Sequence, residues 1–356
     1  MYKYPFQSLT VNESSRKYVN QVLDSNQLTQ GEMVERFENE LGRLYRSNAI
    51  ACNSGTSALH LALIALRVRE GDEVIVPALS FVATANAVVY CGAKVVFADV
   101  DPVTWCISPK EVAKKITGKT KAIIVTSLYG HPIDFAPLRK VAGDIPIIED
   151  AAQRFGPRKL QANLTCFSFH GSKLITTGEG GAVLTDELLY IHTMEYYRGQ
   201  CFDKNISHYY HGGIGYNYRM AEMNAAMGLG QLDDLNWKVT QKYNLRNNYE
   251  KLLPDRVTLQ NPGKGNIHWW AFAVQLPINY HCIREILDEY GIETRPIFFP
   301  LPYLDPYEED NCDNDFSVAS NIHEFGLVLP SSENLLYGDV EYICQVLGNL
   351  IGEEHD

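Results

Sequence analysis

The strongest constraint on the fold is the regular alternation of short apolar runs with helical patterns between residues 51 and 150. The apolar runs cover residues 73–77, 94–101, 122–126 and 145–150, and the helical patterns cover residues 51–66, 80–90, 108–117 and 134–142. Nearly continuous apolar strands that alternate with helices are typical of a mainly parallel sheet with helices on both faces. The sequence therefore predicts an α/β protein, in which ligands bind beyond the carboxyl ends of the strands.

The remaining sequence extends this region in both directions. It predicts helices at 13–25, 32–46, 282–290 and 338–351, a strand at 269–274, an acidic loop at 306–316, and a long bridging helix from Ala221 to about Leu253. A chain of 356 residues is too long for one small core. We therefore predict a large ligand-binding domain at 1–235 and a smaller α+β domain at 236–356.

Composition excludes several classes of partner. The net charge of −12 argues against a nucleic-acid partner, which needs a basic face. The eight cysteines form no C-x-x-C pair, so we expect buried free thiols of a reduced cytoplasm and no metal site. No signal-peptide pattern begins the sequence, and no apolar run approaches the ~18 residues of a membrane span. We expect a cytoplasmic protein without a membrane partner.

Lys173 stands between an apolar run at 166–169 and a glycine-rich turn at 178–181. A lysine at a strand end, with small and aromatic neighbours, can lie in a dry pocket, where desolvation lowers its pKa. The resulting neutral amine can attack a carbonyl carbon, as a Schiff-base lysine must. A solvated surface lysine is the plainer interpretation of this residue taken alone.

Two further features give Lys173 a context. Asp150 ends the strand at 145–150, and Gly55 and Thr56 stand at the start of the apolar helix that runs to about Leu66. Each position also suits a plain helix cap, but the start of a helix is a ready phosphate site. A lysine amine, an aspartate for a pyridinium nitrogen and a phosphate cup are the parts of a pyridoxal 5'-phosphate site. No G-x-G-x-x-G follows the first strand, which disfavours a nicotinamide dehydrogenase.

Eight stretches of the sequence occur in an order and spacing that resemble one family of enzymes. They are LTQGEMVERFE (28–38), NSGTSALHLAL (53–63), VPALSFVATANAV (76–88), LYGHP (128–132), IIEDAAQ (147–153), SFHGSKLITTGEGG (168–181), GYNYRMAEMNAAMGLGQL (215–232) and GIETRP (291–296). Together they resemble the DegT/DnrJ/EryC1/StrS nucleotide-sugar aminotransferases, pyridoxal phosphate enzymes of fold-type I. The resemblance implies a mainly parallel large domain with a smaller α+β C-terminal domain.

The resemblance also implies roles for single residues. Lys173 would form the Schiff base with the cofactor and then carry the proton. Asp150 would keep the pyridine nitrogen protonated, Phe81 would stack on the ring, and Gln153 would lie at the ring's phenolic oxygen. The cofactor phosphate would be bound by Gly55, Thr56 and Ser168.

Asn217 would reach the cofactor phosphate of the neighbouring subunit, which implies a homodimer with shared active sites. Two features depart from the family pattern. The segment between Gln153 and Ser168 lacks the usual glycine-rich turn, so we expect a shortened loop beside an intact cofactor site. His170 stands where several members have Phe or Tyr; a substrate contact is the alternative, but we expect it to pack within the protein.

Within the family the resemblance is closest to GDP-perosamine synthases, through the segments 198–220 and 291–307. It implies glutamate as amino donor and amination at carbon 4 of GDP-4-keto-6-deoxy-mannose. A dTDP- or UDP-linked keto sugar, or a keto sugar acid without a nucleotide, is the alternative substrate. Candidates near the sugar diphosphate are Tyr209, His211, Arg219 and Arg295, since arginine suits a pyrophosphate; a structural role is equally expected for each of them.

Two other functions share this fold. Some relatives are sugar dehydratases in which a histidine replaces the lysine, and a non-enzymatic family member is the second alternative. The presence of Lys173, Asp150 and Gln153 together argues against both.

Overall fold

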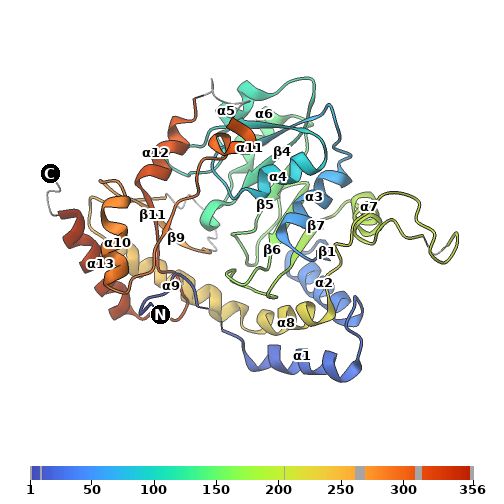
Figure 1. Ribbon diagram of the computed structural model, residues 1–356, viewed down its shortest axis with the longest axis horizontal. Helices are drawn as coiled ribbons and strands as arrows, with labels where there is room; N and C mark the ends of the chain where they lie inside the picture. The colour runs from blue at the N-terminus through green and yellow to red at the C-terminus, as the bar shows by residue number, and fades with distance from the viewer. Residues whose placement is uncertain (1, 9, 204, 261–268, 309–314, 353–356) are drawn as a thin grey trace.

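Two β-sheets organise the protein, one of seven strands and one of four (Figure 1). The computed structural model describes residues 2–8, 10–203, 205–260, 269–308 and 315–352. The large sheet has the order β1-β7-β6-β5-β4-β2-β3. Its strands are β1 (Asn48–Cys52), β2 (Glu73–Pro77), β3 (Lys94–Ala98), β4 (Thr120–Thr126), β5 (Ile147–Asp150), β6 (Leu164–Ser168) and β7 (Gly181–Thr185). Only β7 runs against its neighbours among these strands, which confirms the predicted mainly parallel sheet.

Helices cover both faces of the large sheet, as the alternating pattern predicts. They are α1 (Glu13–Ser25), α2 (Glu32–Tyr45), α3 (Gly55–Ala65), α4 (Ala83–Tyr90), α5 (Pro109–Lys115), α6 (Phe135–Ala142), α7 (Leu188–Arg198) and α8 (Glu222–Asp233). Successive residues of a strand point to opposite faces. Cys166 of β6 therefore packs in the core that contains α3, and Phe167 packs in the core that contains α2 and α8.

Contacts over long sequence separations hold the N-terminal helices in place. The Glu222 carboxylate accepts hydrogen bonds from the backbone N–H groups of Gly31, Met33 and Val34 at 2.8, 2.8 and 2.9 Å, and so caps the start of α2. Helix α1 packs so closely on α8 that a Cβ atom at Gly230 would lie 2.2 Å from the backbone nitrogen of Ser15. A side chain at position 230 would separate the two helices.

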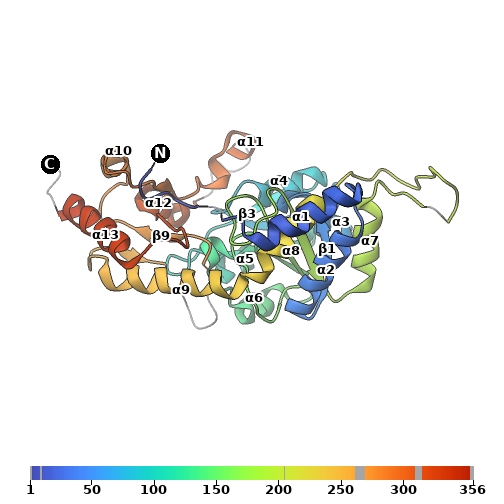
Figure 2. The same ribbon diagram turned by 90° about the horizontal axis from the view of Figure 1, so that it is seen from below.

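The second sheet is antiparallel and has the order β10-β11-β9-β8. Its elements are β8 (Thr258–Leu259), β9 (Phe272–Gln275), α10 (His281–Glu289), β10 (Arg295–Pro296), α11 (Asp305–Glu308), α12 (Ser317–Phe325), β11 (Gly326–Leu329) and α13 (Tyr337–Gly352). Helix α9 (Leu235–Leu252) continues from α8 and packs against α13 beside this sheet (Figures 1 and 2). Tyr4 lies in the same core as Tyr249 and Phe272, so the N-terminal residues also contribute to it.

Two predicted elements differ from the structure. The long helix expected from Ala221 to Leu253 is two helices, because Asp234 leaves the helical conformation between α8 and α9. Trp269 and Trp270 precede β9 instead of belonging to it. Most of the acidic loop at 306–316 lies outside the described residues, and the division at 235/236 stays a prediction. None of the helices in the described part of the chain is long and apolar enough to cross a membrane.

Candidate active site

A cavity of about 270 Å³ opens where β5 and β6 end. Seven of the predicted site residues line it, although they come from four separate stretches of the sequence; they are Gly55, Thr56, Phe81, Asp150, Gln153, Ser168 and Lys173. Parallel strands place their carboxyl ends at one edge of the sheet, which explains why Asp150 and Ser168 meet there.

Lys173 lies in the turn after β6, with its amine inside the cavity. Its Nζ atom lies 3.9 Å from the centre of the Trp270 ring. Burial lowers the pKa of Lys173 from 10.5 to about 8, and the negative charge of Asp150 opposes that shift. An amine with this pKa is partly neutral near physiological pH, as a nucleophile or a proton acceptor requires.

Asp150 is buried at the end of β5, and both of its carboxylate oxygens accept hydrogen bonds. The Thr84 hydroxyl donates to Oδ2 at 2.8 Å, and the Ala152 backbone N–H donates to Oδ1 at 3.1 Å. Burial raises the pKa of Asp150, and the bonds from Thr84 and Ala152 and the charge of Lys173 act against that rise. The carboxylate is suited to a cationic partner such as a protonated ring nitrogen.

Gln153 is held in one orientation by the backbone. Its Oε1 atom accepts a hydrogen bond from the N–H of Tyr129 at 2.7 Å. The side-chain NH₂ group is then left to donate to a ligand. The Tyr129 ring stacks on Trp270 at 6.2 Å and on Phe298 at 5.6 Å between ring centres, so the backbone that fixes Gln153 is itself well packed.

The N-terminus of α3 forms the other end of the cavity. The Ser54 side chain caps this helix by accepting a bond from the Ser57 N–H at 3.1 Å. A Cβ atom at Gly55 would lie 2.8 Å from the Cβ atom of Ser168, so only glycine leaves this cradle open. Free N–H groups, the helix dipole and the hydroxyls of Thr56 and Ser168 suit a phosphate group.

These groups fit pyridoxal phosphate. The amine of Lys173 can form a Schiff base with the aldehyde of the cofactor. Asp150 suits the ring nitrogen, and Gln153 can donate a hydrogen bond to the phenolic oxygen. The cradle at Gly55 suits the phosphate. The ring of Phe81 is half exposed and borders the cavity, where its predicted stacking on the cofactor is sterically open.

Three residues that the sequence analysis did not single out complete this site: Thr84, Trp270 and Phe298. Thr84 lies within a predicted motif, but nothing local shows that its hydroxyl meets Asp150. Trp270 stands 97 residues after Lys173 in the sequence, and its Nε1–H donates to the backbone oxygen of Ser172 at 2.6 Å. Aromatic residues before a strand are common in any core, so only the packing of the two sheets reveals this contact.

The expectation that His170 packs within the protein is wrong. Its side chain is exposed at the rim of the cavity, with Nδ1 at 3.1 Å from the Ser172 hydroxyl and Nε2 at 3.8 Å from a carboxylate oxygen of Glu179. The turn after β6 points outward here because the chain must return to β7, and this places a polar pair beside the entrance.

The structure does not bring the other candidates to this cavity. Tyr209 and His211 belong to the loop that projects from the body after α7 (Figures 1 and 2). Asn217 pairs with Gly199 at the base of this loop, and its backbone oxygen accepts a hydrogen bond from the Asn53 side chain at 3.2 Å, but it does not line the cavity. Arg219 pairs with the end of β1 through its backbone, and Arg295 contacts the Glu293 carboxylate and the ring of Phe6. Their binding roles stay predictions.

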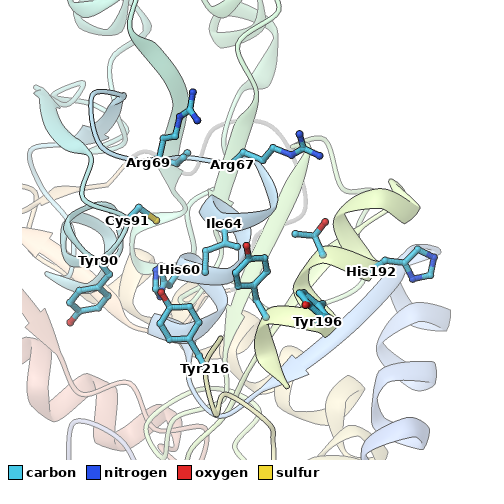
Figure 3. Close-up of a pocket in the computed structure, with 12 residues that line it drawn as sticks. His60, Ile64, Arg67, Arg69, Tyr90, Cys91, His192, Tyr196 and Tyr216 are labelled. Carbon is cyan, nitrogen blue, oxygen red and sulfur yellow. The ribbon is translucent and has the colours of Figure 1, made fainter. Parts of the chain in front are cut away.

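A larger, open cavity of about 800 Å³ lies between α3, the end of α4 and α7 (Figure 3). His60, Arg67, Tyr90 and Tyr216 contribute to its lining. The smaller cavity contains the lysine, the carboxylate and the phosphate cradle, so we assign the chemistry to it.

The fold and the site together define an enzyme built to use pyridoxal phosphate. The chain belongs to the DegT/DnrJ/EryC1/StrS aminotransferase family, whose model matches residues 10–348. A GDP-perosamine synthase of Escherichia coli O157:H7 is 35% identical over 360 residues, which cover 98% of both chains.

Solved structures of similar proteins confirm the fold class. S. venezuelae DesV in complex with a ketimine intermediate has a TM-score of 0.92 and 27% identity, with 99% of this chain and 100% of DesV covered. The E. coli GDP-4-keto-6-deoxy-D-mannose-3-dehydratase with bound hydrated PLP has a TM-score of 0.88 and 26% identity, with coverage of 98% and 100%. The fold is therefore shared by DesV and by a sugar dehydratase.

Proposed function

We propose that this aminotransferase moves an amino group from glutamate to carbon 4 of a 4-keto-6-deoxy sugar carried on a nucleotide. GDP-4-keto-6-deoxy-mannose is the best candidate, and GDP-perosamine is the expected product. The main support for transamination is that Lys173 and the buried Asp150 carboxylate line one cavity. The pKa of the Lys173 amine is lowered to about 8. The sugar is supported by the similarity to a GDP-perosamine synthase over nearly the whole chain.

Pyridoxal phosphate supplies an electron sink when bound, which stabilises negative charge on the substrate carbon next to the transferred nitrogen. Asp150 would hold the proton of the ring nitrogen, and Gln153 would orient the ring through its phenolic oxygen. Gly55, Thr56 and Ser168 would hold the phosphate, while Phe81 would cover one face of the ring.

Lys173 moves the proton in this scheme. Its Nζ accepts the proton from the α-carbon of glutamate and returns a proton to the sugar carbon when the nitrogen is delivered. A pKa near ambient pH lets one group perform both transfers. The Trp270 ring beside Nζ excludes water from this side of the amine.

The proposal includes a homodimer in which Asn217 of each copy reaches the cofactor phosphate of the other. The loop that projects from the body after α7 supports it (Figure 1). Ile206, Tyr209 and Ile214 of this segment are 61%, 79% and 89% exposed, which a second copy would cover. We place the reaction in the cytoplasm, in keeping with buried thiols such as Cys52 and Cys166.

The first test is the absorbance spectrum of the purified protein with added pyridoxal phosphate, before and after glutamate. A yellow band that bleaches with glutamate is expected in the wild type and absent in Lys173→Ala. If the wild type forms no band, the assignment of the cavity is wrong. A band that ignores glutamate but responds to another amine would overturn the donor alone.

The second test identifies the acceptor. GDP-, dTDP- and UDP-linked 4-keto-6-deoxy sugars, and a keto sugar acid, are added to the bleached enzyme, and return of the yellow band is followed with mass spectrometry of the product. We expect GDP-4-keto-6-deoxy-mannose to gain an amine. A deoxygenated product without nitrogen would indicate the dehydratase chemistry and overturn the proposal.

The third test addresses the shared site. Lys173→Ala and Asn217→Asp are each made and then mixed after reversible dissociation. In a shared-site dimer, one site of each mixed dimer has a wild-type Lys173 and a wild-type partner Asn217, so activity reappears. No recovery on mixing, with exchange confirmed by native mass spectrometry, would contradict shared sites.

A further inference from the structure

Three buried hydroxyl groups form a chain that ends on Asp150. The Thr126 and Ser80 oxygens are 3.1 Å apart, those of Ser80 and Thr84 are 2.8 Å apart, and Thr84 donates to Asp150 Oδ2 at 2.8 Å. Thr126 ends the strand β4, Ser80 follows β2, and Thr84 lies in the first turn of α4. Their exposed fractions are 2%, 1% and 0%, so water does not substitute for these contacts.

The number of protons on the three hydroxyl groups fixes which of them donates each hydrogen bond. Each hydroxyl has one proton to donate. Thr84 uses its proton on the Asp150 carboxylate, so it must accept from Ser80. Ser80 has then used its own proton and must accept from Thr126. The bonds therefore run from Thr126 to Ser80, to Thr84 and to Asp150.

The opposite direction requires a protonated Asp150 that donates to Thr84. The reversed chain would end with Ser80 donating to Thr126, and the Thr126 proton would need another acceptor. Among the residues that the structure describes, Ser80 is the only hydrogen-bond partner of the Thr126 hydroxyl. A buried O–H without an acceptor is costly, so the one-way chain favours the ionised carboxylate.

We propose that Thr84 is a positioning residue of the transamination, which holds Asp150 ionised and oriented through the one-way chain Thr126–Ser80–Thr84. The inference rests on the proposed function because it takes the Asp150 carboxylate as the partner of the cofactor's ring nitrogen. The three hydroxyl groups offset the rise in the pKa of Asp150 that burial causes. They do so before any cofactor binds, since all three belong to the protein.

The direct test is the titration of Asp150 in the cofactor-free protein. Aspartate is labelled with ¹³C at the carboxyl carbon, and the Asp150 signal is assigned by its loss in Asp150→Asn. Thr84→Val should move its titration midpoint upward by about one to two pH units, because a bond to a charged group is lost. Thr84→Ser should restore the wild-type midpoint, and Thr126→Val should give a smaller upward movement.

Thr165→Val is the matched control. Thr165 is also a fully buried threonine and lies in β6, next to the strand that ends at Asp150, but its hydroxyl has no hydrogen-bond partner in the described structure. It should leave the Asp150 midpoint in place. An unmoved midpoint in Thr84→Val, or an equal movement in Thr165→Val, would overturn the proposal. If Thr84→Val does not fold, the Asp150 midpoint is compared between Ser80→Ala or Thr126→Val and Thr165→Val. Midpoints that do not differ would overturn the proposal.

The loaded enzyme provides the second readout. Thr84→Val should lower kcat by about tenfold to a hundredfold, with KM for glutamate unchanged within about twofold, and Thr84→Ser should recover most of the rate. Equal losses in Thr84→Val and Thr84→Ser would contradict the role of the hydroxyl. A wild type that binds no pyridoxal phosphate would refute the proposed function, while the titration of Asp150 would still test the hydroxyl chain.

Discussion

Lys173 should react as an amine at a pH where an ordinary lysine is almost entirely protonated. Its pKa is lowered from 10.5 to about 8 by burial. At pH 7.0, a pKa of about 8 leaves about 9% of the amine neutral, whereas a pKa of 10.5 leaves about 0.03%. The neutral fraction is therefore roughly 300-fold larger, and this corresponds to about 3 kcal/mol of destabilised ammonium.

The assay is acetylation of the cofactor-free protein by dilute acetic anhydride between pH 6 and 10, with the rate at each lysine followed by peptide mass spectrometry. Corrected for hydrolysis of the reagent, the rate at Lys173 should reach half of its maximum near pH 8. Lys242 is the internal control, because burial lowers its pKa to about 8 as well. Its Nζ donates to Gln7 Oε1 and to the backbone oxygens of Trp270 and Ser331, so it should react slowly throughout.

The substitution Asp150→Asn tests whether the Asp150 charge raises the pKa of Lys173. The Asp150 charge raises the pKa of Lys173, so its removal should move the half-maximal rate below the wild-type pH. A wild-type rate that still rises steeply at pH 10, as expected for an ordinary lysine, would refute the dry environment of the amine. A midpoint near pH 8 that rises in Asp150→Asn would refute the electrostatic coupling between the two groups.

Three further predictions concern the framework of the site. Arg158→Met removes the guanidinium at 2.7 Å from the buried Glu149 carboxylate, which keeps the Ser127 hydroxyl at 2.7 Å and Arg154 at 3.7 Å, and should cost about 1.5–3 kcal/mol in urea unfolding. Adding Glu149→Gln should recover part of the loss, and additive losses would contradict the pairing. Gly55→Ala pushes a methyl group against Ser168 and should weaken pyridoxal phosphate binding at least about tenfold in an absorbance titration, with wild-type affinity as the contrary result. Glu222→Ala removes the three-bond cap of α2 and should cost about 3 kcal/mol, whereas Glu13→Gln, on a 96% exposed side chain, should cost almost nothing; equal effects would argue against the cap.

The arrangement of the large sheet could be predicted from the sequence because it depends on a local, repeated pattern. Apolar strand-length runs alternate with helices, and a parallel sheet with two covered faces is the simplest way to bury them. The same logic places Asp150 and Ser168 at one edge, since both end strands of that sheet. Lys173 lies in the turn after β6 and Gly55 begins the helix after β1, so the sequence, with the family resemblance, predicted seven residues that the structure brings to one cavity.

Other features depend on contacts that no local pattern specifies. The hydroxyl of Thr84 meets a carboxylate 66 residues away, and the ring of Trp270 reaches Lys173 from the segment before β9. His170 is exposed, although it directly follows the buried Phe169, and the helix between the two sheets breaks at Asp234. The sequence by itself determined which elements form and which strand ends hold chemistry, because periodicity and turn residues act over a few positions. Only the tertiary structure decided which side chains bury Lys173 and Asp150, orient them and shift their pKa values. Those neighbouring side chains are set by how whole helices and sheets pack together.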